Sequence, residues 1–163
     1  MSESMIRDIS LADEGLQRIS WVEKFMPALN TLREEFVKEQ IFKGKTIVMS
    51  IHLEAKTAYL ALTLKAAGAN VICTGSNPLS TQDPIAAGLV KSGITVYAWH
   101  ACTEEEYFMF LNKPLDPTPD IIIAAGGGLG AAILGVHGHR PDLPRSPRRR
   151  CPPGRGRVSH GDL

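Results

Sequence analysis

Four short runs of apolar, largely β-branched residues alternate with longer segments of helical character, and this alternation constrains the fold most. Such runs are too short for buried helices and are typical of strands covered on both faces. The predicted strands span 46–51, 70–74, 94–98 and 120–123. Strands separated by helices of about 10 to 15 residues pair in parallel through right-handed crossovers. The sequence therefore predicts an α/β, Rossmann-like three-layer domain with a short parallel sheet of about four strands.

The intervening segments carry helix-forming patterns and helix-capping signals. The predicted helices span 13–39, 54–67, 83–92 and 103–112. Pro27 predicts a break within the first segment, whose apolar stripe should pack these N-terminal helices on the sheet. Asp83 is the expected N-cap of the third helix. Thr103 with Glu106 forms the pattern of a capping box at the start of the fourth.

The composition changes after residue 123, which predicts two regions of different character. Residues 1–120 carry a net charge of −4, whereas residues 121–163 carry +5. Residues 140–163 hold seven arginines, five prolines and three glycines. Such a segment buries too little apolar area to offset its ordering entropy. We therefore predict a folded domain over 1–123 and an atypical Gly/Arg/Pro-rich tail over 124–163, either disordered or translated out of frame.

Several classes of protein are excluded by simple counts. No stretch approaches 18 uninterrupted apolar residues, so we expect no membrane span. Acidic residues interrupt the first 30 positions, which do not resemble a signal peptide. The three cysteines, Cys73, Cys102 and Cys151, are widely spaced and predict no disulfide framework. These features favour a cytoplasmic location.

Polar residues that directly follow the strands are the candidate ligand contacts, because open parallel sheets bind ligands beyond the carboxyl ends of their strands. His52 is the most informative, since a histidine at a strand end can exchange protons near neutral pH. Solvated first-turn residues and ordinary turn and cap chemistry are the alternative interpretation. The candidates are His52, Glu54, Lys56, Thr57, Ser76, Asn77, Ser80, Thr81, Gln82, Asp83, Trp99 and His100.

Three blocks of sequence resemble the adenosylhomocysteinase (S-adenosyl-L-homocysteine hydrolase) family, in the form found in archaea and thermophilic bacteria. They are IHLEAKTAYL over 51–60, GSNPLSTQD over 75–83 and ITVYAW over 94–99. The resemblance covers roughly residues 8–123. It implies reversible hydrolysis of S-adenosylhomocysteine to adenosine and homocysteine in one-carbon metabolism, by a cytoplasmic homo-oligomer. In the family, a tightly bound NAD oxidises the ribose 3′-hydroxyl and thereby acidifies the neighbouring C4′ proton.

The resemblance implies that residues 1–123 form a partial substrate-binding domain, and it implies roles for individual residues of that domain. His52 matches a catalytic histidine that transfers a proton near the 5′ position. Glu54 and Thr57 lie in the segment that contacts adenosine, and Lys56 stands where other branches carry a glutamate for the adenine edge. The second loop contributes the substrate-binding residues Asn77, Ser80 and Gln82.

The sequence departs from the family pattern at the end of the fourth predicted strand. Where the family reads DDGGDL, residues 124–129 read AAGGGL, and Ala125 matches the position of the catalytic aspartate. The remaining catalytic residues and the NAD-binding domain have no counterpart in these 163 residues. We therefore expect a fragment that is inactive alone.

Two weaker patterns suggest cofactors, and we discount both. Gly126, Gly128 and Ala131 mimic a dinucleotide fingerprint, but no acidic residue follows at the distance needed to hold a ribose. His137 and His139 are a chance occurrence rather than a metal site. We expect no metal, and no NAD bound by this chain alone.

Two further functional hypotheses stay open at this point. The domain is either part of a hydrolase or a non-catalytic module that binds adenosine or another protein. The arginines at 148–150 also allow a basic arm that contacts nucleic acid through phosphates, although no aromatic residue is interleaved for base stacking. An inert terminus is the simplest alternative for the tail.

Overall fold

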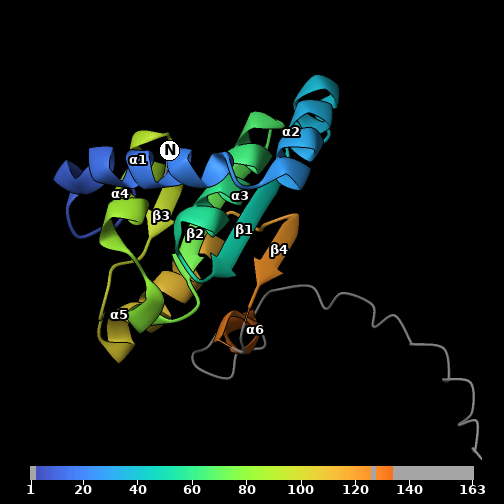
Figure 1. The fold of residues 1–163 in the computed structure, drawn as a ribbon. Coiled ribbons are helices and arrows are strands. Elements are labelled where there is room, and N and C mark those ends of the chain that lie inside the picture. The colour runs from blue at the N-terminus through green and yellow to red at the C-terminus, as the bar shows by residue number, and fades with distance from the viewer. Residues whose placement is uncertain (1–2, 126–127, 134–163) are drawn as a thin grey trace, which may run out of the picture.

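The computed structural model describes residues 3–125 and 128–133, and it contains a four-stranded, all-parallel sheet (Figure 1). The order across the sheet is β3-β2-β1-β4. The strands are β1 (Thr46–Ile51), β2 (Asn70–Gly75), β3 (Thr95–Tyr97) and β4 (Ile121–Ala124). All four carboxyl ends lie along one edge, as the predicted parallel topology requires.

Helices cover both faces of the sheet and give the predicted three layers. They are α1 (Ala12–Glu23), α2 (Pro27–Glu39), α3 (Ala55–Ala66), α4 (Asp83–Lys91), α5 (Glu104–Asn112) and α6 (Gly128–Ile133). Short 3-10 turns form at Ile9–Leu11, Pro78–Ser80 and Lys113–Leu115. Pro27 is the first residue of α2, so the predicted break within the N-terminal helical segment is confirmed.

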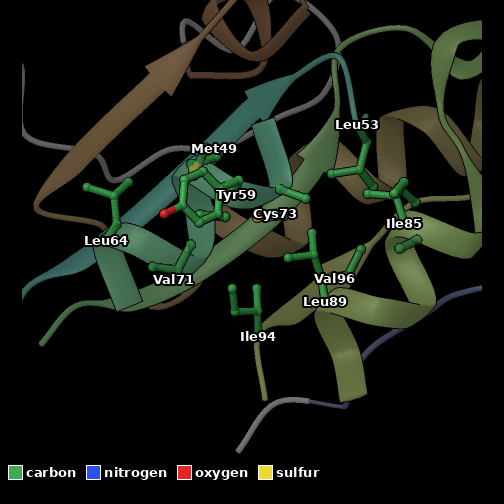
Figure 2. Close-up of a cluster of buried hydrophobic side chains, with 14 of the residues drawn as sticks. Met49, Leu53, Tyr59, Leu64, Val71, Cys73, Ile85, Leu89, Ile94 and Val96 are labelled. Carbon is green, nitrogen blue, oxygen red and sulfur yellow. The ribbon is translucent and has the colours of Figure 1, made fainter. Parts of the chain in front are cut away.

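Alternate residues of the strands point to opposite faces and form two separate cores. On one face, Met49, Cys73 and Val96 pack with residues of α1, α3 and α4 (Figure 2). On the other face, Val48 and Ile72 pack with residues of α5 and α6. The continuous apolar strands are therefore explained by burial on both sides.

The N-terminal helices are anchored by a backbone-to-backbone approach between α1 and α4. A Cβ atom added to Gly15 would lie 1.8 Å from the carbonyl oxygen of Pro84. Only a glycine allows α1 to approach this closely. The helix α2 packs beside α3 and contributes no fully buried residue, so α1 makes most of the attachment to the core.

One local prediction needs correction. Asp83 is the first residue of α4 rather than its N-cap, which is Gln82. The Asp83 carboxylate instead accepts a hydrogen bond from the His100 backbone N–H at 2.7 Å and pairs with Arg7 at 3.4 Å. Tertiary partners have therefore replaced the local cap.

The domain boundary predicted after residue 123 stays a prediction. Strand β4 includes Ala124, and the helix α6 follows from Gly128, with the Leu129 side chain buried in the core that contains Val48. The arginine-rich segment and the histidines at 137 and 139 lie outside the described residues. Within the described part of the chain, no helix is both long and apolar enough to span a membrane.

Candidate functional site

Two loops at the carboxyl edge of the sheet are joined into one surface, which we call the paired loops (residues 52–57 and 76–82). Backbone N–H groups of Ser76 and Gln82 donate to the carbonyls of Ile51 and Leu53, each at 3.1 Å. A third link joins the His52 Nδ1 atom to the Ser80 hydroxyl at 2.6 Å. The structure thus brings together the two segments that the sequence marked as a shared ligand surface.

The Thr57 hydroxyl fixes the turn between β1 and α3. Its single proton is shared between the carbonyls of His52 at 2.5 Å and Glu54 at 2.9 Å, and its oxygen accepts from the Glu54 backbone N–H at 3.1 Å. This bonding holds the His52 backbone in place at the start of the helix. Thr57 therefore has a structural role here, in addition to any contact with a ligand that its position implies.

The second loop is held by Asn77. Its side-chain oxygen accepts from the Leu79 N–H at 2.9 Å, and its carbonyl accepts from the hydroxyls of Ser80 at 3.0 Å and Thr81 at 3.3 Å. From the opposite face of the sheet, the Tyr107 hydroxyl donates to the Ser76 carbonyl at 2.9 Å. Burial raises the pKa of Tyr107, and the nearby Cys102 raises it further, so this phenol remains a donor at neutral pH.

Gln82 is reached by a residue that sequence reasoning did not identify. Arg18 of α1 donates to the Gln82 side-chain oxygen at 3.2 Å and is itself paired with Glu14 one helical turn earlier. No local pattern announces this contact, because α1 and Gln82 meet only through the packing of α1 against α4. The bond orients the Gln82 amide.

The predicted site residues differ in how far they face solvent. His52, Lys56 and Asn77 are exposed, while Glu54, Thr57, Ser80 and Gln82 are partly buried. Lys56 lies in the first turn of α3, and within the described part of the chain no ion pair holds its ammonium group. Next to the paired loops, Thr74, Trp99 and Tyr107 line a cavity of about 10 Å³, which has room for one water molecule. The paired loops therefore form a wall on which His52, Lys56 and Asn77 face solvent.

The remaining candidates near the third strand make local contacts. The His100 Nδ1 atom lies 3.1 Å from the Thr81 carbonyl, and the Trp99 indole donates to Glu106 at 3.3 Å. Glu106 also completes the predicted capping box with Thr103. These bonds tie the end of β3 to the neighbouring elements.

Neither cysteine thiols nor metal ligands provide chemistry in the described residues. Burial raises the pKa of Cys73 to about 12, and burial also raises the pKa of Cys102, so neither is a ready nucleophile. Among residues 3–125 and 128–133, no group of three or more metal-binding side chains comes together.

Ala125 lies at the same edge of the sheet, on the other side of β1. Its backbone N–H donates to the Ser50 carbonyl at 2.9 Å, and its side chain is exposed. An aspartate at this position would therefore stand beside the end of the strand that leads into His52. The methyl group of alanine can neither accept a proton nor bind a hydroxyl.

Residues 3–149 match the family model of S-adenosyl-L-homocysteine hydrolase, so the match extends beyond residue 123. The chain is 49% identical to an adenosylhomocysteinase of Pyrococcus abyssi over 142 residues, which cover 87% of this chain and 33% of that protein. An S-inosyl-L-homocysteine hydrolase of Methanocaldococcus jannaschii is 51% identical over 85% of this chain and 32% of its own. A Thermotoga maritima adenosylhomocysteinase is 54% identical, over 71% and 28% respectively. The chain thus spans about a third of the length of these relatives.

Proposed function

Since the chain belongs to the S-adenosyl-L-homocysteine hydrolase family, we propose that its paired loops hold the nucleoside part of S-adenosylhomocysteine or of a close analogue. The reaction is the reversible hydrolysis of this thioether to a nucleoside and homocysteine, a step of one-carbon metabolism. The observation that carries the proposal is the joining of the two family blocks, 51–60 and 75–83, through the bond between His52 and Ser80.

His52 is proposed as the proton-transfer residue. Its exposed ring follows directly from β1, and its backbone is fixed by Thr57. A histidine can protonate a departing thiolate and accept a proton from water at neutral pH. Asn77 and Gln82 supply amide groups on the same wall, where they can pair with the ribose or homocysteine.

NAD supplies the redox step in the family, but the described residues do not fit a dinucleotide site. The closest pattern includes Gly128, where an added Cβ atom would lie 2.6 Å from the Tyr107 hydroxyl. This glycine makes room for a tyrosine side chain rather than for a pyrophosphate. No step is therefore assigned to NAD on these residues.

Lys56 is proposed to contact the base and to favour a 6-oxopurine. An ammonium group carries only donors, so it can pair with the 6-oxo group of hypoxanthine but not with the 6-amino group of adenine. Several similar proteins are S-inosyl-L-homocysteine hydrolases, with 45% to 51% identity. S-inosyl-L-homocysteine is therefore the second candidate substrate.

Calorimetry with adenosine and inosine tests both candidates. We expect binding of at least one nucleoside. Lys56→Gln should weaken the binding of inosine more than that of adenosine, because glutamine also offers an acceptor for the 6-amino group of adenine. Lys38→Gln, at an exposed position of α2 away from the paired loops, is the matched control and should change the affinity for neither nucleoside. Absence of heat for both nucleosides at millimolar concentration would rule out the binding role.

The 163-residue polypeptide by itself is proposed to bind without turnover. Ala125 offers no proton acceptor at the position that matches the family's aspartate. The purified polypeptide should release no homocysteine from S-adenosylhomocysteine or S-inosylhomocysteine when NAD is supplied. Turnover clearly above the uncatalysed rate contradicts the proposal and leaves a non-catalytic binding module untenable.

We also propose a cytoplasmic location and a homo-oligomeric parent, as in the family. The two described cysteines, Cys73 and Cys102, are free thiols, which agrees with a reducing compartment. Fractionation of the native host, with detection of the endogenous protein, tests the location. Its sedimentation behaviour tests the assembly.

A further inference from the structure

A chain of two hydrogen bonds links His52 through the Ser80 hydroxyl to the Asn77 carbonyl. The Ser80 hydroxyl lies 3.0 Å from the Asn77 carbonyl oxygen and 2.6 Å from the His52 Nδ1 atom. A carbonyl oxygen only accepts, and a serine hydroxyl has one proton to donate. When that proton goes to Asn77, the serine oxygen can only accept from the ring.

We propose that Ser80 is a positioning residue that holds neutral His52 with its proton on Nδ1. The lone pair then lies on Nε2, at the other end of an exposed ring. Ser80 is thereby assigned to orienting the histidine rather than to contacting substrate. The inference rests on the proposed function only for its meaning in catalysis, because the bonding pattern is a property of the free protein.

Both ends of this hydrogen-bond chain are fixed by the backbone. Asn77 is held through its side-chain oxygen by Leu79, and Ser76 beside it donates to the end of β1. His52 is held through its carbonyl by Thr57. The backbone is therefore hydrogen-bonded on both sides of the contact between Ser80 and His52.

The partner of His52 is neutral, and this shapes what the ring can do. When Nε2 gains a proton, Nδ1 keeps its hydrogen and its bond to Ser80, so no neighbouring group has to turn. A carboxylate partner, as in serine protease triads, would in addition stabilise the imidazolium by charge. With serine, the ring is oriented for proton exchange at Nε2 without being held in its charged form.

The test is the ring nitrogen spectrum of the ¹⁵N-labelled full chain, with His52 assigned by comparison with His52→Gln. At a pH where His52 is neutral, we expect Nδ1 to be the protonated nitrogen and Nε2 to show the shift of an unprotonated nitrogen. In Ser80→Ala, the Nδ1-protonated form should fall from the major to the minor form. Ser80→Thr keeps a hydroxyl and should restore it.

His100 is a control within the same spectrum. Its Nδ1 atom faces the Thr81 carbonyl, which only accepts, so His100 should stay protonated on Nδ1 in every variant. A proton on Nε2 of His52 in the unmodified protein overturns the proposal, even if Ser80→Ala fails to fold. So does a Ser80→Ala spectrum in which His52 is unchanged. Calorimetry with nucleosides reports separately on the proposed function, so the two failures are distinguishable.

Discussion

The two sides of β1 differ in how well they are packed. Toward β2, the paired loops and the helices α1, α3 and α4 enclose the sheet, and Ile47 is only 1% exposed. Toward β4, Ile121 stands opposite Ile47 in the register yet is 37% exposed, as is Ile122 on the other face. The residues that match the family blocks lie on the enclosed side, whereas the altered positions 124 and 125 lie at the end of the exposed strand β4. The paired loops are thus built on the better-packed side of β1, and the sequence departs from the family pattern where the packing is thinnest.

Ile47 and Ile121, which are paired across β1 and β4, offer the strongest test of this difference in packing. Ile47→Ala should lower the free energy of unfolding by about 2 to 5 kcal/mol, because it leaves a cavity in a closed core. Ile121→Ala removes the same atoms from a position that is already partly hydrated and should cost about 1 kcal/mol. Urea unfolding of the two variants measures both values. Equal losses would show that the two sides are packed alike.

Substitutions of two glycines, one in α1 and one in α6, extend the comparison of packing to the helices. Gly15→Ala forces a methyl group against the Pro84 carbonyl and should destabilise the protein by about 1 to 3 kcal/mol or more. Gly130→Ala in α6 meets no atom within 4 Å and should stabilise by about 0.5 to 1 kcal/mol. Thermal unfolding of both variants shows whether each substitution stabilises or destabilises the protein. A stabilising Gly15→Ala would mean that α1 and α4 are not in close contact.

The start of β4 gives the smallest expected effect, and it depends on pH. The Thr46 backbone N–H, which donates to Asp120 at 2.8 Å, is the main reason that the pKa of Asp120 is lowered, and the Lys45 ammonium at 2.9 Å adds to it. A lowered pKa in the folded state stabilises the protein above the usual aspartate pKa of about 4, and this contribution is lost as the pH falls through the folded value. At pH 7, Asp120→Asn should therefore have a lower free energy of unfolding than the unmodified protein. The two values should converge as the pH falls toward 3.

Lys45→Met serves as the matched variant for this measurement. It removes the ammonium group but leaves the bond from Thr46, so most of the pH dependence should persist. Urea unfolding from pH 7 to pH 3 compares the three proteins. A pH dependence that vanishes with Lys45 would assign the effect to charge rather than to the backbone bond.

The sheet and the candidate surface were predictable because their signals are local. Each strand is a continuous apolar run bounded by turn residues, and the break at Pro27 and the cap at Thr103 are set by neighbouring residues. The family blocks likewise placed His52 and Ser80 on adjoining loops. Asp83 was misplaced as a cap because its partners, Arg7 and His100, come from distant parts of the chain.

Contacts between residues far apart in the chain could not be predicted, because no local sequence pattern indicates them. Arg18 reaches Gln82 across 64 residues, and Tyr107 reaches the Ser76 carbonyl across 31. The helix α6 was missed because a segment rich in glycine and alanine has no clear apolar period. Only the burial of Leu129 against the sheet explains it.

The strand order has a consequence for the growing polypeptide on the ribosome. Strand β1 ends at Ile51, but its neighbour β4 begins only at Ile121, after both other strands have been made. At about 5 to 20 residues per second, translation of the 69 residues between them takes about 3 to 14 s. Throughout that interval, one hydrogen-bonding edge of the central strand has no native partner within the nascent chain. The pace of elongation therefore determines how long this edge is available to chaperones or to a neighbouring nascent chain.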